Sequence, residues 1–426
     1  MSAQIIEYKT VIAGERMSAS DGATMPIINP ANGTVIARAP KCGSNEVNLA
    51  VAAALKAAPE WASKTVGERS KVLLKLSQLI MANLNELARL ETMEHGSPIR
   101  KTMNFDVPLC AEQLEYFAGV GRALTGETLP VGPWCTSMTI REPLGVVGLI
   151  TPWNFPALMV VWKLGAALIT GNTVVVKPPS ITPLTTIRLA ELALEAGAPP
   201  GVVNVVTGPG ETVGEALVQH PDVTKIGFTG DTVTGKRIMS LASSSVKQVG
   251  LELGGKNAFI VLADADVDSA VEGAVFGAFF NTGQVCAAAS RFYIHESLYD
   301  RFTEKFVEAS SHLKYGDPMN METVLGPVAY AAHRDKIEGY IERAKKAGAD
   351  LLLGGERPDT PDTKDGFFVA PTVFGSCSND MEIMRDEIFG PVIALCKFKT
   401  NEEAVALTND TKYGLSASVW TKDLEN

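Results

Sequence analysis

The 426-residue sequence lacks the features of several protein classes. It contains no CxxC pair, which argues against a zinc site and a disulfide framework; its six cysteines are scattered, at Cys42, Cys110, Cys135, Cys286, Cys377 and Cys396. No bound metal is expected. The first residues show no basic segment followed by a long apolar stretch, so we expect no secretory signal, reduced thiols and a cytoplasmic location.

Positive charge is also scarce. Lys and Arg total 38 against 48 Asp and Glu, which gives a net charge of −10. Such a surface repels phosphate backbones, so nucleic acid is not an expected partner. The most apolar stretch, residues 145–176, is interrupted by Pro152, Asn154, Pro156 and Lys163. It is therefore interpreted as buried strand, turn and helix, and no membrane association is expected.

The composition, 46% hydrophobic and 20% charged, is ordinary for a globular protein, and the length predicts two or three domains. Short β-branched or apolar segments alternate with helical ones after residue 144, which predicts a doubly wound, mostly parallel α/β sheet. The predicted strands are 146–150, 173–176, 202–206, 225–229 and 248–251, and the predicted helices include 156–170 and 183–196, the latter with Thr182 as N-cap. A second α/β unit is predicted from a strand at 257–262 and helices near 266–280 and 298–313.

The region before this sheet has two features. Apolar residues at helical spacing predict helices over 45–61 and 70–95. Residues 125–143 instead contain Gly, Pro and alternating side chains, which indicate an extended ribbon. A ribbon of that length has no place in a helix-covered sheet, so we expect it to reach another subunit.

Three short runs carry the chemistry. Cys286 lies in Phe-Asn-Thr-Gly-Gln-Val-Cys-Ala (280–287), Glu252 in Leu-Glu-Leu-Gly-Gly-Lys (251–256) and Asn154 in Thr-Pro-Trp-Asn-Phe-Pro (151–156). A thiol can attack a carbonyl, a carboxylate can activate water to release the product, and an amide can stabilise an oxyanion. Taken alone, each residue also fits a simpler role: Cys286 as a core residue, Glu252 as a surface residue and Asn154 as a turn residue. Three matched contexts in this order favour the catalytic interpretation.

Together these runs resemble the signature of the NAD(P)-dependent aldehyde dehydrogenases. The resemblance implies an oxidoreductase that oxidises an aldehyde through a thiohemiacetal and a thioester on Cys286, with Glu252 as the general base for hydrolysis. Asn154 and the backbone N–H of Cys286 would bind the oxyanion, and Lys163 would lie beside the proton exit path. It also implies an aldehyde dehydrogenase-like α/β fold: a dinucleotide-binding domain (1–124 and 144–253), an oligomerisation β-ribbon (125–143) and an α/β catalytic domain (254–426), assembled as a homodimer or homotetramer.

NAD is the implied cofactor. The run Gly208-Pro-Gly210 misses the GxGxxG fingerprint and reads more simply as a tight turn, whereas Phe228-Thr-Gly-Asp lies where the family holds the pyrophosphate. Ser180 stands where the family often has an acidic residue that excludes a 2′-phosphate, so NADP is a possible cofactor too. The implied cofactor contacts are Thr151, Pro152, Trp153, Lys177, Ser180, Gly210, Phe228, Thr229, Gly230, Asp231, Val233, Leu253, Glu387 and Phe389.

The substrate is less well defined. Met159 and Trp162 share a helix face with Lys163 and, with Phe155, Val285 and Ala287, would line an apolar tunnel for an aliphatic or aromatic aldehyde. Spacing alone fits equally well with Met159 and Trp162 as core residues.

Three alternative functions remain open. A CoA-acylating semialdehyde dehydrogenase would pass the thioester to CoA, although Glu252 favours water. A thiol hydrolase or acyltransferase would need a His base, and none of the five histidines lies in a recognisable motif. The third alternative is a truncated, inactive chain that serves as a binding or interaction protein. It is considered because the resemblance ends before the C-terminal segment of the family.

Overall fold

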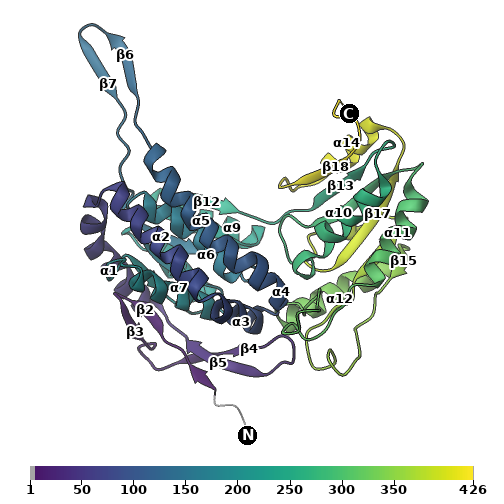
Figure 1. Cartoon of the computed structure of the whole chain (residues 1–426), viewed down its shortest axis with the longest axis horizontal. Helices are drawn as coiled ribbons and strands as arrows, with labels where there is room; N and C mark the ends of the chain where they lie inside the picture. The colour runs from purple at the N-terminus through teal and green to yellow at the C-terminus, as the bar shows by residue number, and fades with distance from the viewer. Residues whose placement is uncertain (1–4, 426) are drawn as a thin grey trace. The chain divides into compact units, whose positions relative to one another are not determined.

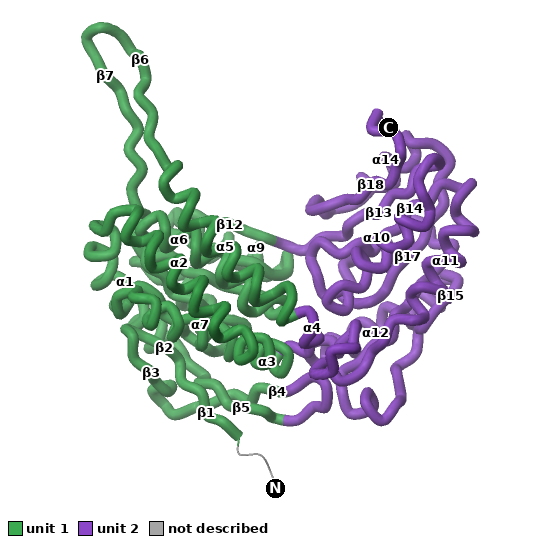
Figure 2. Tube along the Cα trace, in the orientation of Figure 1, with its two compact units in different colours: residues 1–28, 35–94, 102–252 green, residues 29–34, 95–101, 253–426 purple. Residues whose placement is uncertain are grey.

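The computed structural model describes residues 5–425, and the fold consists of two units (Figures 1 and 2). Unit 1 contains the residues up to Ile28 together with Val35–Glu94 and Thr102–Glu252. Unit 2 contains Asn29–Thr34, His95–Lys101 and the chain from Leu253 onward. Both units are α/β.

Unit 1 is built on a five-stranded parallel sheet. Its order is β10-β9-β8-β11-β12, and its strands are β8 (Val146–Ile150), β9 (Thr173–Lys177), β10 (Val203–Val205), β11 (Val223–Thr229) and β12 (Gln248–Glu252). The chain moves outward from β8 to β10 and then returns to the other side of β8 to form β11. This is the doubly wound order in which the two halves of a dinucleotide-binding sheet meet at a switch point, here between β8 and β11.

Helices pack on this sheet. They are α1 (Ser44–Ser63), α2 (Val66–Ala82), α3 (Leu84–His95), α5 (Val107–Val120), α6 (Pro156–Ile169), α7 (Leu184–Glu195), α8 (Glu215–Gln219) and α9 (Thr232–Ala242). Helix α6 contacts β8 and β9, and α2 and α5 pack against α6. Helix α1 contacts β8, β9 and β10, and α9 contacts β12. The predicted strands and the helix at 156–170 are confirmed, with ends that differ by two residues or fewer.

Two helix predictions were wrong in detail. The helix predicted over 70–95 is two helices, because the chain leaves helical geometry at Asn83, whose side-chain Nδ2 donates to Leu79 O at 2.7 Å. Thr182 does not cap the next helix, since α7 begins at Leu184. Its first amides, of Leu184 and Thr185, donate instead to the buried carboxylate of Glu94 at 2.7 and 3.0 Å.

The predicted ribbon is an antiparallel hairpin of β6 (Thr128–Gly132) and β7 (Cys135–Met138), which extends away from the helices of unit 1 (Figure 1). The N-terminal part of unit 1 forms a three-stranded sheet, β1-β5-β4, and a second hairpin, β2-β3; these strands are β1 (Ile6–Glu7), β2 (Thr10–Ile12), β3 (Glu15–Met17), β4 (Thr24–Ile28) and β5 (Val35–Pro40).

Unit 2 contains a six-stranded sheet of order β15-β16-β17-β14-β13-β18, parallel except for β15. Its strands are β13 (Asn257–Val261), β14 (Ala289–His295), β15 (Asp350–Leu353), β16 (Thr372–Gly375), β17 (Val392–Phe398) and β18 (Ala417–Trp420). Its helices are α4 (Ile99–Lys101), α10 (Val267–Phe279), α11 (Tyr299–Ser311), α12 (Ala331–Lys346), α13 (Glu382–Arg385) and α14 (Asn401–Asn409).

Alternation along β13 gives this sheet two apolar faces. Phe259 and Val261 belong to one buried cluster with residues of α10 and α11, whereas Ala258 and Ile260 belong to another with residues of α12. Successive side chains of a strand point to opposite faces, so a strand covered on both sides is apolar throughout. In residues 5–425, no helix combines the length and apolar character needed to cross a bilayer.

Candidate active site

The carboxyl edge of the unit 1 sheet gathers many of the predicted cofactor contacts. Thr151 follows β8, Lys177 ends β9 and Thr229 ends β11. Ligands of doubly wound sheets bind at this edge, beside the switch point. The hydroxyls of Thr151 and Thr229 are buried there without a hydrogen-bond partner. Buried polar atoms are normally paired, so these two hydroxyls fit a polar ligand at this edge.

Lys177 and Ser180 follow the same edge. Lys177 is buried, and burial lowers its pKa to about 8. The Ser180 hydroxyl donates to Gly208 O at 2.9 Å, which ties the loop after β9 to the loop after β10. Gly208 has a φ of +144°, and a Cβ there would lie 2.8 Å from Cys42 O, so this position requires glycine. Gly210 is exposed and open, and its cofactor contact stays a prediction.

The turn between β11 and α9 contains a closely packed glycine and a helix start capped by a carboxylate. Gly230 N donates to Glu252 O at 3.0 Å, and a Cβ on Gly230 would lie 2.5 Å from the buried ring of Phe228. The Asp231 carboxylate is the N-cap of α9, and its Oδ1 accepts from Thr234 N at 2.9 Å. The first turn of a helix offers amides to an anion, but here one of them is already bound by a carboxylate. Val233 is largely exposed in this turn.

Asn154 lies in the turn before α6. The residue is buried, Trp153 and Pro152 are half-buried, and Pro156 is the first helical residue. A second carboxylate of α3, that of Glu91, accepts a hydrogen bond from Ala157 N at 3.3 Å. Thus α3 presents Glu91 to the start of α6 and Glu94 to the start of α7. Neither residue was predicted, because neither lies in a motif.

Lys163 and Glu252 of unit 1 interact electrostatically. Lys163 lies on α6 above β11, with its Cδ 3.7 Å from the position of a Cβ on Gly227. Burial lowers the pKa of Lys163, and the nearby charge of Glu252 acts in the opposite direction. Glu252 is exposed at the end of β12. On the same helix Met159 is buried, whereas Trp162 is 43% exposed in this structure and so is not a core residue.

The remaining predicted residues belong to unit 2, and Cys286 is the chemically distinctive one. Its thiol is half-buried, whereas Cys42, Cys110, Cys377 and Cys396 are buried and Cys135 is exposed on the hairpin. Burial raises the pKa values of Cys42, Cys377 and Cys396 to about 11, 12 and 11. Those three thiols stay protonated at neutral pH and are poor nucleophiles.

The segment before Cys286 has an unusual backbone. Asn281, Thr282 and Gly283 have φ values of 54°, 57° and 71°, and only the last is a glycine. Left-handed backbone at non-glycine residues is held by its surroundings and is found often at functional sites. Here Thr282 Oγ1 donates to Gly326 O at 3.1 Å, and Ser97 Oγ donates to Asn281 Oδ1 at 2.7 Å.

Ser97 is the centre of a buried polar cluster beneath this segment. Lys101 Nζ donates to Ser97 Oγ at 3.1 Å, and His95 Nδ1 lies 3.0 Å from the same oxygen. Gln284 also supports the segment before Cys286. Its Oε1 accepts a hydrogen bond from Ala329 N at 3.0 Å, and its Nε2 donates to Asn281 O at 3.2 Å. None of these residues was predicted, because their contacts join segments that are far apart in the sequence.

The predicted cofactor contacts Glu387 and Phe389 lie beside this segment. Together with Gly255, Gly283, Val285 and Ala288 they line a small pocket in unit 2. Glu387 Oε1 accepts from Gly255 N at 3.1 Å. Phe389 has a φ of 62°, and its carbonyl accepts a 2.7 Å hydrogen bond from His333 Nε2. Burial lowers the pKa of His333 to about 4, so the ring is neutral and Nε2–H is the donor.

Both glycines after Leu253 are closely packed. A Cβ on Gly254 would lie 2.6 Å from Glu387 Cδ, and one on Gly255 would lie 2.8 Å from Cys286 O. Leu253 itself is half-buried. The Gly-Gly pair therefore lets one segment approach both the Glu387 carboxylate and the backbone of the cysteine turn.

Comparison with known proteins assigns the chain to a family. Residues 17–426 match the model of the aldehyde dehydrogenase family. Betaine aldehyde dehydrogenase of Bacillus subtilis (strain 168) is 44% identical over 418 residues, which are 97% of this chain and 85% of the relative. The chain belongs to the aldehyde dehydrogenase family, as its three motifs predicted.

Solved structures agree with this assignment. A putative aldehyde dehydrogenase from Burkholderia cenocepacia superposes with a TM-score of 0.97 at 41% identity, covering 99% of this chain and 86% of that one. An aldehyde dehydrogenase from Bacillus cereus, solved as its NAD+ complex, gives 0.96 at 41% identity, covering 98% and 85%. The predicted fold class is confirmed.

Proposed function

We propose that this protein oxidises an aldehyde to a carboxylic acid with NAD+, using Cys286 as nucleophile. The observation that supports this most directly is the half-buried Cys286 thiol, which follows a left-handed segment at 281–283, in contrast to the four buried cysteines. Family membership supplies the reaction class. The alternative of a thiol hydrolase has less support, because the buried neutral His333 donates to a backbone carbonyl.

In the first half of the reaction the Cys286 thiolate forms an S–C bond to the carbonyl carbon, and the π electrons move to oxygen. The side-chain amide of Asn154 and the backbone N–H of Cys286 donate to that oxyanion, and losing one such donor typically costs about 10²–10³ in rate. NAD+ supplies the hydride acceptor. Departure of hydride with its electron pair restores the C=O bond and leaves a thioester on Cys286.

In the second half Glu252 takes a proton from water, whose oxygen attacks the thioester carbonyl. The C–S bond breaks, the carboxylic acid leaves, and the electron pair returns to sulfur as thiolate. General-base assistance of this kind contributes roughly 10²–10⁴-fold. Lys163, whose pKa burial lowers, is close enough to feel the charge of Glu252 and would carry the proton onward.

The carboxyl edge of the unit 1 sheet would hold the dinucleotide. Support comes from the two unpartnered buried hydroxyls, Thr151 and Thr229, and from the buried amine of Lys177, which would bind the ribose. The amides of Thr232 and Val233 would bind the pyrophosphate. With Ser180 in place of a carboxylate, NADP is accepted alongside NAD. Glu387 and Phe389 would hold the nicotinamide ribose and ring.

The substrate that we propose is a neutral aliphatic or aromatic aldehyde. Phe155 and Met159 are buried apolar residues close to Asn154 in the chain, and Trp162 is exposed on the same helix as Met159. Incubating the protein with NAD+ and a panel of neutral and charged aldehydes, with NADH absorbance as readout, tests the activity. Adding CoA separates the alternatives, since a free acid indicates hydrolysis and an acyl-CoA indicates the CoA-acylating reaction. Absence of NADH with every aldehyde would overturn the proposal.

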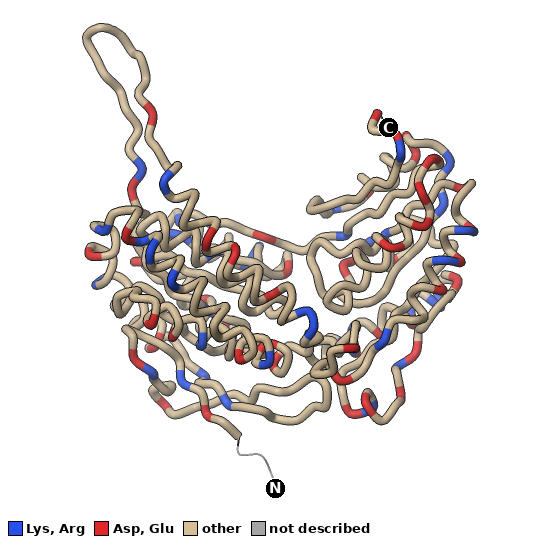
Figure 3. Tube along the Cα trace, viewed as in Figure 1, with Lys and Arg blue, Asp and Glu red and all other residues tan. Residues whose placement is uncertain are grey.

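We also propose that the protein is a cytoplasmic homodimer or homotetramer assembled through the β6–β7 hairpin. Trp134, Met138 and Ile140 are 80%, 60% and 75% exposed there, and no charged residue lies between Thr128 and Met138 (Figure 3). Exposed apolar clusters of this kind mark protein interfaces. Ile140→Glu is expected to lower the oligomer mass in sedimentation measurements, and an unchanged mass would remove the hairpin from the interface.

A further inference from the structure

Asn257, the first residue of β13, reaches from its own strand to the turn that carries Cys286. Its Nδ2 donates to Cys286 O at 2.6 Å and to Ala288 O at 3.0 Å. Its Oδ1 accepts from Ser416 N, just before β18, at 3.0 Å. One buried side-chain amide therefore joins the starts of three neighbouring strands, β14, β13 and β18, and uses both donors and its acceptor to do so.

The turn that Asn257 holds is short. Ala288 N donates to Val285 O at 3.0 Å, so Cys286 occupies the second position of a four-residue turn. Asn257 binds the carbonyls of the second and fourth residues of that turn. Ser416 Oγ donates to the carbonyl between them, of Ala287, at 3.3 Å. All three carbonyls that follow the thiol along the chain are thus bonded to side chains.

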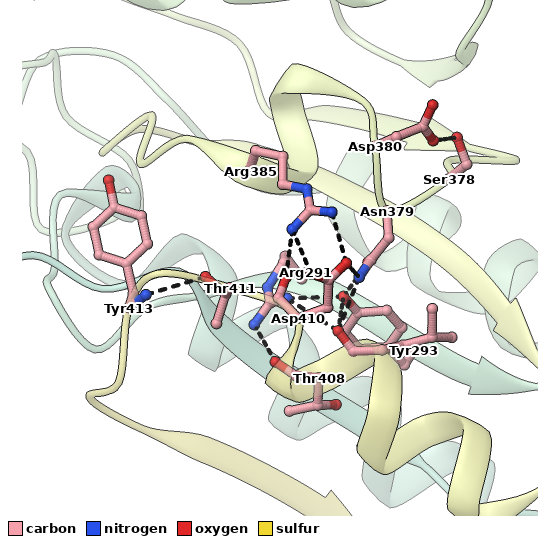
Figure 4. A network of polar contacts seen from close by, with 11 residues as sticks. Arg291, Tyr293, Ser378, Asn379, Asp380, Arg385, Thr408, Asp410, Thr411 and Tyr413 are labelled. Carbon is pink, nitrogen blue, oxygen red and sulfur yellow. Dashed lines mark hydrogen bonds and ion pairs between the residues drawn. The ribbon is translucent and has the colours of Figure 1, made fainter.

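The base of Asn257 is itself fixed. Arg291, fully buried on β14, donates from Nε to the carbonyl of Lys256 at 2.8 Å. Its other nitrogens bond to the C-terminal end of α14, including Thr408 O at 2.9 Å (Figure 4). In the same network Tyr293 donates to Asn379 Oδ1 at 2.6 Å, and Arg385 binds Asp410. A guanidinium held by several acceptors cannot shift without breaking bonds, so the peptide before Asn257 is rigid.

We propose that Asn257 is a positioning residue for Cys286, whose side-chain amide sets the orientation of the thiol-bearing turn through the carbonyls of Cys286 and Ala288. The inference rests on the proposed role of Cys286 as nucleophile. Attack on a carbonyl requires the sulfur to approach along a narrow path, and a displacement of about 1 Å can cost about 10²-fold in rate. Iodoacetamide diffuses freely and can orient itself to the thiol, so alkylation does not require the thiol to point at a bound substrate. Comparing the rates of the two reactions therefore distinguishes a change in the orientation of the thiol from a change in its reactivity.

The chain contains a matched control. Asn204 on β10 is also a buried amide whose Nδ2 donates to two backbone carbonyls, Val174 O at 3.2 Å and Gly201 O at 2.7 Å. Its Oδ1 accepts from Ala13 N at 2.9 Å. Asn204→Ala thus removes the same set of bonds as Asn257→Ala, but in the other unit and away from any thiol turn. Asn257→Asp is the second test variant, since it keeps the shape of the side chain and loses both donors.

The experiment uses the full chain with Cys135→Ser, because Cys135 is exposed and would also be alkylated. The rate of the first NADH turnover after mixing with aldehyde measures thioester formation, and iodoacetamide labelling against pH measures thiol reactivity. For Asn257→Ala and Asn257→Asp we expect first-turnover rates to fall about 10- to 100-fold. At high pH, where the thiol is ionised, the labelling rate of Asn257→Ala should stay within about 3-fold of the parent rate. Its binding of NAD+ should be unchanged. Asn204→Ala should lower the melting temperature similarly and leave the first turnover intact.

Three outcomes would overturn the inference: a first-turnover rate within about 2-fold of the parent in either Asn257 variant, an equal loss in Asn204→Ala, or parallel losses of turnover and labelling in both Asn257 variants. Failure of the proposed function is a different result, in which the parent protein itself forms no NADH or Cys286→Ser remains active.

Discussion

The carboxylate of Glu387 lies directly against the Cα of Gly254, and its Oε1 accepts a hydrogen bond from the next amide, of Gly255, at 3.1 Å. Glu387, the proposed ribose contact, is thus packed on the segment that directly follows Glu252, the proposed base. A methyl group on Gly254 would overlap the carboxylate, so the two residues have to change together.

Gly254→Ala is therefore expected to displace Glu387 and weaken cofactor binding by about tenfold, which corresponds to about 1.4 kcal/mol. The dissociation constant for NAD+, measured by fluorescence titration, checks this. Gly250→Ala on β12 is the control, because nothing lies within 4 Å of the position of its Cβ. If both variants bound NAD+ as the parent does, Glu387 would have no part in holding the ribose.

Cys286→Ser should abolish turnover, by at least about 10³-fold, because a hydroxyl without an adjacent base is a far weaker nucleophile than a thiolate. NAD+ binding should be largely intact, since the proposed cofactor residues are unchanged. Steady-state NADH formation and NAD+ titration make the comparison. Cys396→Ser is the control, because burial keeps that thiol protonated. Near-normal NADH formation by the Cys286 variant would end the thiol mechanism.

Ser180→Glu is expected to change cofactor preference. The parent should use NADP as well as NAD, since position 180 carries a hydroxyl bonded to Gly208 O and no carboxylate. A carboxylate there would repel the 2′-phosphate, so kcat/KM for NADP should fall about 10- to 100-fold while that for NAD changes much less. Ser180→Ala separates loss of the hydroxyl from gain of charge. Strict rejection of NADP by the parent would contradict the assignment.

The pH dependence of NADP binding follows from Lys177. Burial lowers the pKa of this ammonium to about 8, so its charge is present below that pH and lost above it. The attraction to the 2′-phosphate should therefore weaken as the pH rises through about 8, and the dissociation constant for NADP should increase more than that for NAD. Lys177→Arg keeps its charge throughout the range, because a guanidinium stays protonated. An NADP affinity that is flat from pH 7 to pH 9 in the parent would exclude this role.

The sequence predicted the fold class and the unit 1 strands because buried parallel strands such as 146–150 are short β-branched or apolar runs with turns between them. It did not predict the break at Asn83, since the apolar spacing of the two helices continues across it. The residues next to α7 predict Thr182 as its N-cap, whereas the acceptor in the structure, Glu94, comes from the distant helix α3.

The residues of the candidate site also differ in whether the sequence alone could predict them. Cys286, Glu252 and Asn154 each stand in a local motif, so they could be proposed from sequence. Residues that support them, such as Asn257 and Glu91, act through contacts with distant segments. Asn257 reaches the thiol turn only because β13 and β14 pair with Asn257 beside Ala289. No spacing along the chain encodes that register.

The most direct test of the account is pre-steady-state kinetics of Glu252→Gln with excess NAD+ and excess neutral aldehyde, followed by intact-mass analysis. Acylation does not need the base, so we expect a burst of about one NADH per active site and then little turnover, with the acyl mass retained on Cys286. Continuous turnover at the parent rate would remove Glu252 from the base role. A burst without an acyl adduct on Cys286 would contradict the covalent mechanism itself.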